Sequence, residues 1–181
     1  KYIKGKEIKF DDVEEVNKVI NSINSNEGKI IDKKVTTSKE YAPKLFSLTS
    51  LQGYITSKYS NFTSDKVLSV CQSLYEGSWK GGYITYPRTD SIYLEESLAS
   101  KVSQTLDKLK VGLEYENKIK FTKTKRVFDS SKVDSHSAII PTYIIPTKLT
   151  PDEQIVYNAI KDRFIANFMP PAEYENTEIK T

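Results

Sequence analysis

Residues 150–171 read Thr-Pro-Asp-Glu-Gln-Ile-Val-Tyr-Asn-Ala-Ile-Lys-Asp-Arg-Phe-Ile-Ala-Asn-Phe-Met-Pro-Pro. Thr150 and Glu153 have the spacing of a capping box, and the proline between them stands at the first helical position. The two closing prolines stop the pattern, so a helix from 151 to 168 is predicted. Apolar residues at helical spacing form its predicted buried face: Val156, Tyr157, Ile160, Phe164 and Phe168.

Helical spacing of apolar residues predicts three more helices upstream. The first lies near residues 49–59. The second begins at Ser64 or Asp65, either of which can cap it, and stops at Gly77. The third covers residues 95–110, so helices dominate the middle of the chain.

Extended segments flank these helices. Residues 29–41 alternate between apolar and polar types, which predicts a strand with one wet face, and residues 174–180 also favour an extended backbone. Before them, residues 11–24 predict an amphipathic helix and residues 2–10 predict another strand.

This order predicts an α+β fold of two domains. A mainly helical domain at 43–168 is expected to be inserted between β-containing segments of a second domain, at 1–42 and 169–181.

Composition sets the class of protein. The chain has 181 residues, a net charge of +3 and 38% apolar residues, as expected for a globular protein with a core. No apolar run is long enough to span a membrane, and no secretory signal opens the sequence. The single cysteine, Cys71, excludes an internal disulfide or a zinc ribbon in this segment, so a cytoplasmic location is expected.

Candidate catalytic side chains are concentrated in Tyr83–Ser91, which reads Tyr-Ile-Thr-Tyr-Pro-Arg-Thr-Asp-Ser. The phenol of Tyr86 can attack phosphorus to form an ester, and Arg88 can hold a phosphate oxygen. Two plainer interpretations stay open. Tyr86 is one of 12 tyrosines, most of which should be packing residues. Arg88 can instead form a surface ion pair with Glu95 or Glu96.

Two further features have alternatives of the same kind. Asp90 and Ser91 either belong to the active centre or cap the turn that leads to the helix near Glu95. The long segment Gly112–Thr142 has no helical period and is expected to be functional or mobile. Its basic cluster is either a solvated face or a track for a phosphate backbone, and consists of Lys118, Lys120, Lys123, Lys125, Arg126 and Lys132.

The Tyr83–Ser91 stretch closely resembles the active-site motif of type IA DNA topoisomerases, especially the topoisomerase III branch, in which proline follows the tyrosine. His136–Thr142, His-Ser-Ala-Ile-Ile-Pro-Thr, is similar to a second element of that family. Leu45–Gln52 and Gln72–Glu76 resemble segments ahead of the tyrosine. Four blocks in the family's order, over roughly residues 42–170, make the resemblance specific.

The resemblance implies roles for individual residues. Tyr86 would be the nucleophile, Arg88 would hold the scissile phosphate, and His136, the only histidine, would support the site and contact DNA. The residues expected to contact single-stranded DNA are Arg126, Lys123, Lys125, Lys132, Thr89 and Asp90.

The resemblance also implies partners outside this chain. Type IA enzymes bind Mg²⁺ on an acidic Toprim domain that faces the tyrosine, and we find neither that acidic cluster nor the clamp-base domain here. The chain is therefore expected to be a fragment without a metal site of its own, inactive without the Toprim domain, and ATP-independent. A non-catalytic helical module for single-stranded DNA is the alternative. A tyrosine recombinase fragment is disfavoured by the three widely spread arginines.

Overall fold

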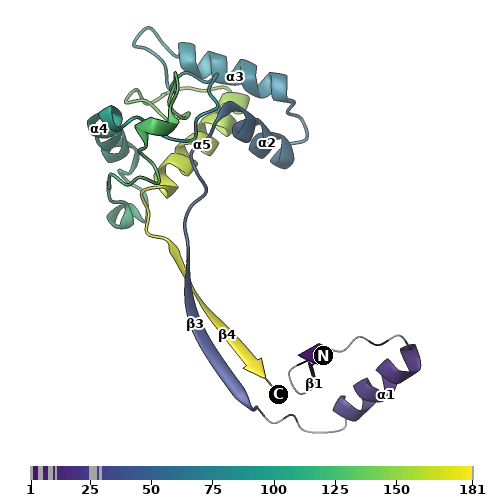
Figure 1. Cartoon of the computed structure of the whole chain (residues 1–181). Coiled ribbons are helices and arrows are strands. Elements are labelled where there is room, and N and C mark those ends of the chain that lie inside the picture. The colour runs from purple at the N-terminus through teal and green to yellow at the C-terminus, as the bar shows by residue number, and fades with distance from the viewer. Residues whose placement is uncertain are drawn as a thin grey trace. The chain divides into compact units, whose positions relative to one another are not determined.

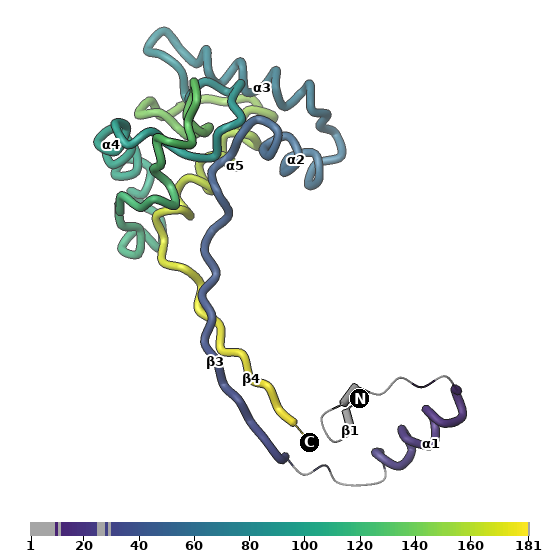
Figure 2. Tube along the Cα trace, in the orientation of Figure 1, coloured from purple at the N-terminus to yellow at the C-terminus, as the bar shows by residue number. Residues whose placement is uncertain are grey.

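The structure, a computed structural model, describes residues 2–3, 6–7, 10, 12–24, 28 and 30–180 (Figures 1 and 2). The chain divides into two compact units, residues 1–39 with 173–181 and residues 40–172. Within the described ranges, no helix combines the length and the apolar character needed to cross a bilayer.

Helix α5 (Pro151–Ala166) is the centre of the larger unit and contacts three other helices (Figure 1). The capping box is confirmed: the Thr150 hydroxyl accepts a hydrogen bond from the Glu153 N–H at 3.3 Å, and the Glu153 carboxylate accepts one from the Thr150 N–H at 2.8 Å. All five residues of the predicted apolar face are buried, so that prediction is also confirmed.

The other helices of this unit are α2 (Leu48–Lys58), α3 (Ser64–Glu76) and α4 (Ala99–Leu109). Their existence confirms the predictions, but two starts differ. Thr63, not Ser64 or Asp65, caps α3, because its hydroxyl accepts a hydrogen bond from the Lys66 N–H at 3.2 Å. A 3₁₀ turn, η1 (Glu96–Leu98), precedes α4 where one continuous helix was predicted.

Two clusters of buried side chains form the core, and α5 contributes to both. Val156, Tyr157 and Ile160 pack with α2 and α3, whereas Phe164 and Ile165 pack with α4. Burial on both sides stabilises α5 far more than its intrinsic propensity does.

The long segment Gly112–Thr142 packs into this core despite its lack of periodicity. It contains only two 3₁₀ turns, η2 (Glu116–Lys118) and η3 (Ser130–Lys132). Its buried side chains are Ile119, Val127, Phe128, Ala138, Ile139, Ile140 and Pro141. Much of the segment is therefore fixed by tertiary packing.

The smaller unit holds the extended elements. Strands β3 (Asp32–Glu40) and β4 (Ala172–Lys180) pair, with ion pairs Lys180–Asp32 (3.6 Å) and Lys39–Glu173 (3.1 Å) near opposite ends, so they run antiparallel. Every residue of β3 is exposed, so the prediction of one wet and one dry face is wrong.

The N-terminal elements also differ from expectation. Where one strand was predicted over residues 2–10, the structure has two short antiparallel strands, β1 (Tyr2–Ile3) and β2 (Lys6–Glu7). The remaining residues of that segment, except Phe10, lie outside the described ones. Helix α1 (Val13–Asn24) is present as predicted, but none of its residues is buried in this chain.

The larger unit begins and ends at neighbouring points. The Asn167 amide donates a hydrogen bond to the Pro43 carbonyl (3.0 Å), and the Arg163 guanidinium donates one to the Lys44 carbonyl (2.9 Å). An inserted domain needs such proximity. The insertion itself, with boundaries at 42/43 and 168/169, stays a prediction.

Substitutions at two separate glycines, Gly82 and Gly53, test how closely the backbone just before Tyr83–Ser91 lies to its neighbours. A Cβ on Gly82 would lie 2.1 Å from the Tyr75 carbonyl oxygen, whereas a Cβ on Gly53 in α2 would meet nothing within 4 Å. Gly82→Ala should therefore lower the free energy of unfolding by about 1–3 kcal/mol. Gly53→Ala should raise it by up to about 1 kcal/mol. Urea unfolding followed by circular dichroism measures both. Equal stability of the two variants would contradict this close approach.

Candidate active site

Two extended segments, residues 82–89 and 136–142, run antiparallel and build the site. The Thr142 N–H donates to the Tyr83 carbonyl and the Thr85 N–H donates to the Ile140 carbonyl, both at 2.9 Å. Threonine hydroxyls extend this pairing. Thr85 donates to the Ala138 carbonyl at 3.1 Å and accepts from the Ile140 N–H at 3.0 Å.

The second segment is also tied to the start of α2. The Ile139 N–H donates to the Phe46 carbonyl at 2.8 Å, and the Leu48 N–H donates to the Thr89 carbonyl at 2.9 Å. Both segments are therefore fixed against the helical core.

This pairing brings Tyr86 and His136 together. Their ring centroids are 4.4 Å apart. Tyr75, from α3, packs against Tyr86 in a T-shaped pair with ring centroids 5.5 Å apart and ring planes at 80°. Tyr86 is half-buried and His136 is exposed. Within the described ranges the Tyr86 hydroxyl has no hydrogen-bond partner, so the ring is held while its oxygen is available.

Arg88 is exposed and lines a shallow groove of about 480 Å³ along α3, with Asp65, Gln72 and Glu76 among the other lining residues. Its guanidinium forms no ion pair or hydrogen bond with any described residue. The alternative of a pair with Glu95 or Glu96 is therefore not found.

Glu96 has other partners. Its carboxylate pairs with Lys125 at 2.7 Å and with Lys123 at 3.3 Å, and hydrogen bonds from Lys125 first and Lys123 second lower the pKa of Glu96. The carboxylate of Glu95 accepts a hydrogen bond from the Ser97 hydroxyl.

Thr89 and Ser91 connect the site segments. Thr89 is only 6% exposed, and its hydroxyl donates to the His136 carbonyl at 2.9 Å and accepts from the Ser91 N–H at 3.1 Å. The Ser91 hydroxyl donates to the Tyr93 carbonyl. No side chain caps η1 itself, but the Ser91 hydroxyl accepts a hydrogen bond from the Tyr93 N–H at 3.1 Å and so caps the turn that leads to η1. The capping alternative is therefore confirmed for Ser91 and stays a prediction for Asp90. Asp90 is exposed, and DNA contacts of Thr89 and Asp90 stay a prediction.

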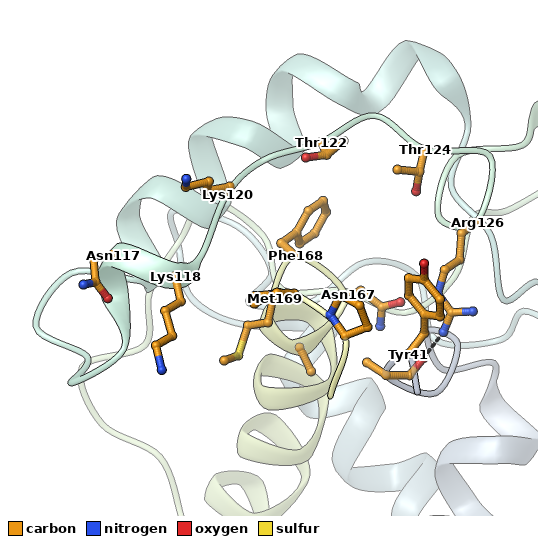
Figure 3. Close-up of a pocket in the computed structure, with 14 residues that line it drawn as sticks. Tyr41, Asn117, Lys118, Lys120, Thr122, Thr124, Arg126, Asn167, Phe168 and Met169 are labelled. Atoms are coloured by element: carbon orange, nitrogen blue, oxygen red, sulfur yellow. Dashed lines mark hydrogen bonds between the residues drawn. The ribbon is translucent and has the colours of Figure 1, made fainter. Parts of the chain in front are cut away.

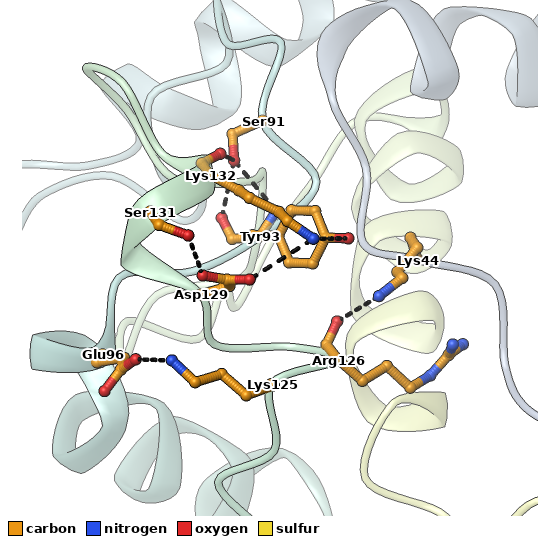
Figure 4. Close-up of polar contacts among 9 residues, drawn as sticks. All are labelled: Lys44, Ser91, Tyr93, Glu96, Lys125, Arg126, Asp129, Ser131 and Lys132. Carbon is orange, nitrogen blue, oxygen red and sulfur yellow. Dashed lines mark hydrogen bonds and ion pairs between the residues drawn. The ribbon is translucent and has the colours of Figure 1, made fainter.

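Tyr93 lies between two lysines (Figure 4). The Lys132 ammonium is 3.5 Å from its hydroxyl oxygen and 4.8 Å from its ring centroid, and the Lys44 ammonium is 4.5 Å from the same centroid. The hydrogen bond from Lys132, reinforced by Lys44, lowers the pKa of Tyr93. Lys132 also pairs with Asp129 at 3.6 Å.

The four basic residues named as DNA contacts, Arg126, Lys123, Lys125 and Lys132, therefore all have partners inside the chain. Arg126 donates to the Ala42 carbonyl and lies 5.1 Å from the Tyr41 ring centroid. The exposed ion pairs of Lys123, Lys125 and Lys132 contribute little free energy, so a DNA phosphate can replace them. DNA contacts by these lysines and by Arg126 stay a prediction.

Sequence reasoning missed three residues near the site: Tyr75, Tyr93 and Lys44. Tyr75 stands in the Gln72–Glu76 block that already resembled the family, and that block was the available signal. The placement of Lys44 beside Tyr93 depends on tertiary structure and leaves no local pattern.

Comparisons with known proteins identify the class. A family model described as DNA topoisomerase matches residues 1–181. The chain therefore belongs to the DNA topoisomerase family, in its type IA branch. It is 32% identical over 175 residues to DNA topoisomerase 3 of Staphylococcus epidermidis, with 92% of this chain and 24% of the relative covered. DNA topoisomerase 3 of Bacillus subtilis is 30% identical over 183 residues, with 97% and 25% covered.

The fold is shared with a solved structure. Full-length topoisomerase I from Thermotoga maritima matches with a TM-score of 0.65 and 28% identity, over 96% of this chain and 28% of that chain. The chain spans about a quarter of the length of its curated relatives.

Thr89→Val tests the link between the two site segments. Valine keeps the shape but removes both hydroxyl contacts and leaves the His136 carbonyl without this donor. We expect the free energy of unfolding to fall by about 1–3 kcal/mol. We also expect the His136 ring-proton resonances to move toward unstructured values as the Tyr86 ring withdraws. Because the chain has one histidine, NMR resolves this directly.

Thr147→Val, at an exposed position, is the control. Unchanged His136 resonances in Thr89→Val would contradict the link.

Proposed function

We propose that this chain carries the nucleophile of a type IA DNA topoisomerase and that Tyr86 is that nucleophile. The observation that carries the proposal is the arrangement around its ring. The rings of Tyr75 and His136 both pack against the Tyr86 ring. Among the described residues, the Tyr86 hydroxyl has no hydrogen-bond partner and the exposed Arg88, two residues later, has no ion pair.

The chemistry follows from these groups. The Tyr86 oxygen attacks the phosphorus of a single-stranded DNA phosphodiester, the bond to the 3′ oxygen breaks, and a 5′-phosphotyrosine and a free 3′ hydroxyl result. Attack of that hydroxyl on the phosphotyrosine restores the strand after another strand has passed. The ester conserves the bond energy, so the reaction needs no ATP.

Arg88 and His136 serve this step in different ways. The guanidinium of Arg88 offers paired donors to a phosphate and offsets the charge that develops on its oxygens. His136 packs against the nucleophile and orients its ring. The acids of the groove, Asp65 and Glu76, lie along the wall that also contains Arg88.

The residues present do not fit a Mg²⁺ site. Among the described residues, no group of three or more His, Cys, Asp or Glu side chains is placed to hold a metal ion. We propose that Mg²⁺ binds a Toprim domain elsewhere in the parent protein, that a clamp-base domain completes the DNA path, and that the parent is cytoplasmic. On this proposal the fragment alone does not cleave DNA.

Tyr86→Phe separates catalysis from binding. In the full-length enzyme we expect loss of the covalent adduct with single-stranded DNA, because only the attacking oxygen is removed and the ring still packs. Noncovalent DNA affinity should stay within about twofold, since the backbone contacts that dominate affinity remain. Trapped adducts are measured on denaturing gels. An adduct at normal yield in Tyr86→Phe would reject Tyr86 as nucleophile. Binding without any adduct in the unaltered enzyme would favour the non-catalytic DNA-binding module.

Arg88→Lys tests the phosphate contact. Lysine keeps the charge but loses the planar fork, so cleavage should fall by about tenfold or more. The melting temperature should not change, because the Arg88 guanidinium forms no hydrogen bond or ion pair with any described residue. Lys101→Arg, an exchange at an exposed site on α4, is the control for the charge type. A melting temperature that drops together with activity would point to a structural role for Arg88.

A further inference from the structure

A second pocket lies apart from Tyr86, within the larger unit (Figure 3). It has a volume of about 560 Å³ and is formed by residues 41–42, 117–126 and 166–171. None of Tyr86, Arg88 and His136 lines it. Its size lies within the range of pockets that bind small organic ligands, about 300–1,000 Å³.

The charged residues that line this pocket are all basic. Lys118, Lys120 and Arg126 line it and no acidic residue does, although the chain has 24 acids. Both lysines are exposed, and neither side chain has a hydrogen bond or ion pair with any residue that the structure describes. In this they differ from Lys123 and Lys125, which share Glu96.

The rest of the wall suits a flat ring with polar edges. Tyr41 is 54% exposed, and its ring has the Arg126 guanidinium 5.1 Å from the centroid. The Asn167 amide nitrogen donates to the Pro43 and Arg163 carbonyls, which leaves its buried Oδ1 without a partner among the described residues.

These groups are ordered along the pocket. In Figure 3, Lys118 and Lys120 lie toward one end and Tyr41 and Arg126 toward the other, with Asn167 and Phe168 between them. Two unpaired lysines at one end, and an exposed aromatic ring beside Arg126 at the other, match the phosphate and the base of one nucleotide.

We propose that this pocket binds a nucleotide of single-stranded DNA at a second site, separate from the strand that Tyr86 cleaves. Lys118 and Lys120 hold the phosphate, and the base lies against Tyr41. The proposal rests on the proposed function, which supplies DNA as the ligand.

The first test removes the two lysines. Fluorescence anisotropy with a labelled oligothymidylate measures the affinity of the 181-residue chain over a series of salt concentrations. Each phosphate contact on a single strand contributes about −0.7 to the slope of log affinity against log salt. Lys118→Gln with Lys120→Gln should make the slope less steep by about 1.4 and weaken binding at low salt on the order of tenfold. The melting temperature should not change.

Matched lysines control for general electrostatics. Lys101→Gln with Lys148→Gln removes the same charge at exposed positions outside the pocket. An equal loss in this control pair would overturn the pocket, as would an unchanged slope in the Lys118/Lys120 pair or no binding of DNA by the unaltered chain.

Tyr41→Leu and the covalent assay complete the test. Tyr41→Leu should weaken binding by about fivefold or more without changing the salt slope, since stacking is lost and no phosphate contact is. In the full-length enzyme, the Lys118/Lys120 variant should still form the adduct at saturating DNA, and Tyr86→Phe should still show the full salt slope. Loss of the adduct in the unaltered enzyme would count against Tyr86 alone. An unchanged affinity in Tyr41→Leu would count against the pocket alone.

Discussion

The antiparallel pairing of residues 82–89 with 136–142 is the constraint on which the rest of the site depends. Neither segment forms a regular strand, and the backbone contacts between them are few. Threonine hydroxyls supply the missing contacts, at Thr85, Thr89 and Thr142. Because these bonds are local to the pairing, they fix the side chains that extend from it, and Tyr86 meets His136 as a result.

The second of these segments also separates the two halves of the core. Ala138 and Ile140 pack into the cluster that contains α4, whereas Ile139 packs into the cluster that contains α2 and α3. An extended backbone directs successive side chains to opposite sides, so one short segment is buried from both. Displacing it would disturb both clusters at once. The position of His136, at the exposed start of this segment, is therefore rigidly supported although its own ring lies at the surface.

The sequence predicted what local rules control and missed what tertiary contacts control. The helix from Pro151 was predictable because its capping box, its proline and its apolar face agree. The cap of α3 was misplaced by one residue because Thr63 and Ser64 are both good caps. The dry face of β3 was wrongly predicted, since alternation shows which side chains are apolar but not whether anything covers them. Tyr86, Arg88 and His136 were proposed from the motif, and their roles stay a prediction. Their geometry, and the pairing of Glu96 with two lysines, join residues far apart in the sequence.

The contacts of the other two arginines support the proposed role of Arg88 as a phosphate ligand. Arg126 donates to the Ala42 carbonyl, and Arg163 donates to the Lys44 carbonyl with its guanidinium 4.0 Å from the Phe46 ring centroid. Both arginines thus satisfy carbonyls where the chain enters the larger unit, a place where irregular backbone lacks partners of its own. A rigid fork of donors suits that task, and it equally suits a phosphate. Because Arg88 alone among the arginines uses none of its guanidinium donors on the described chain, it is the arginine that remains available for a ligand.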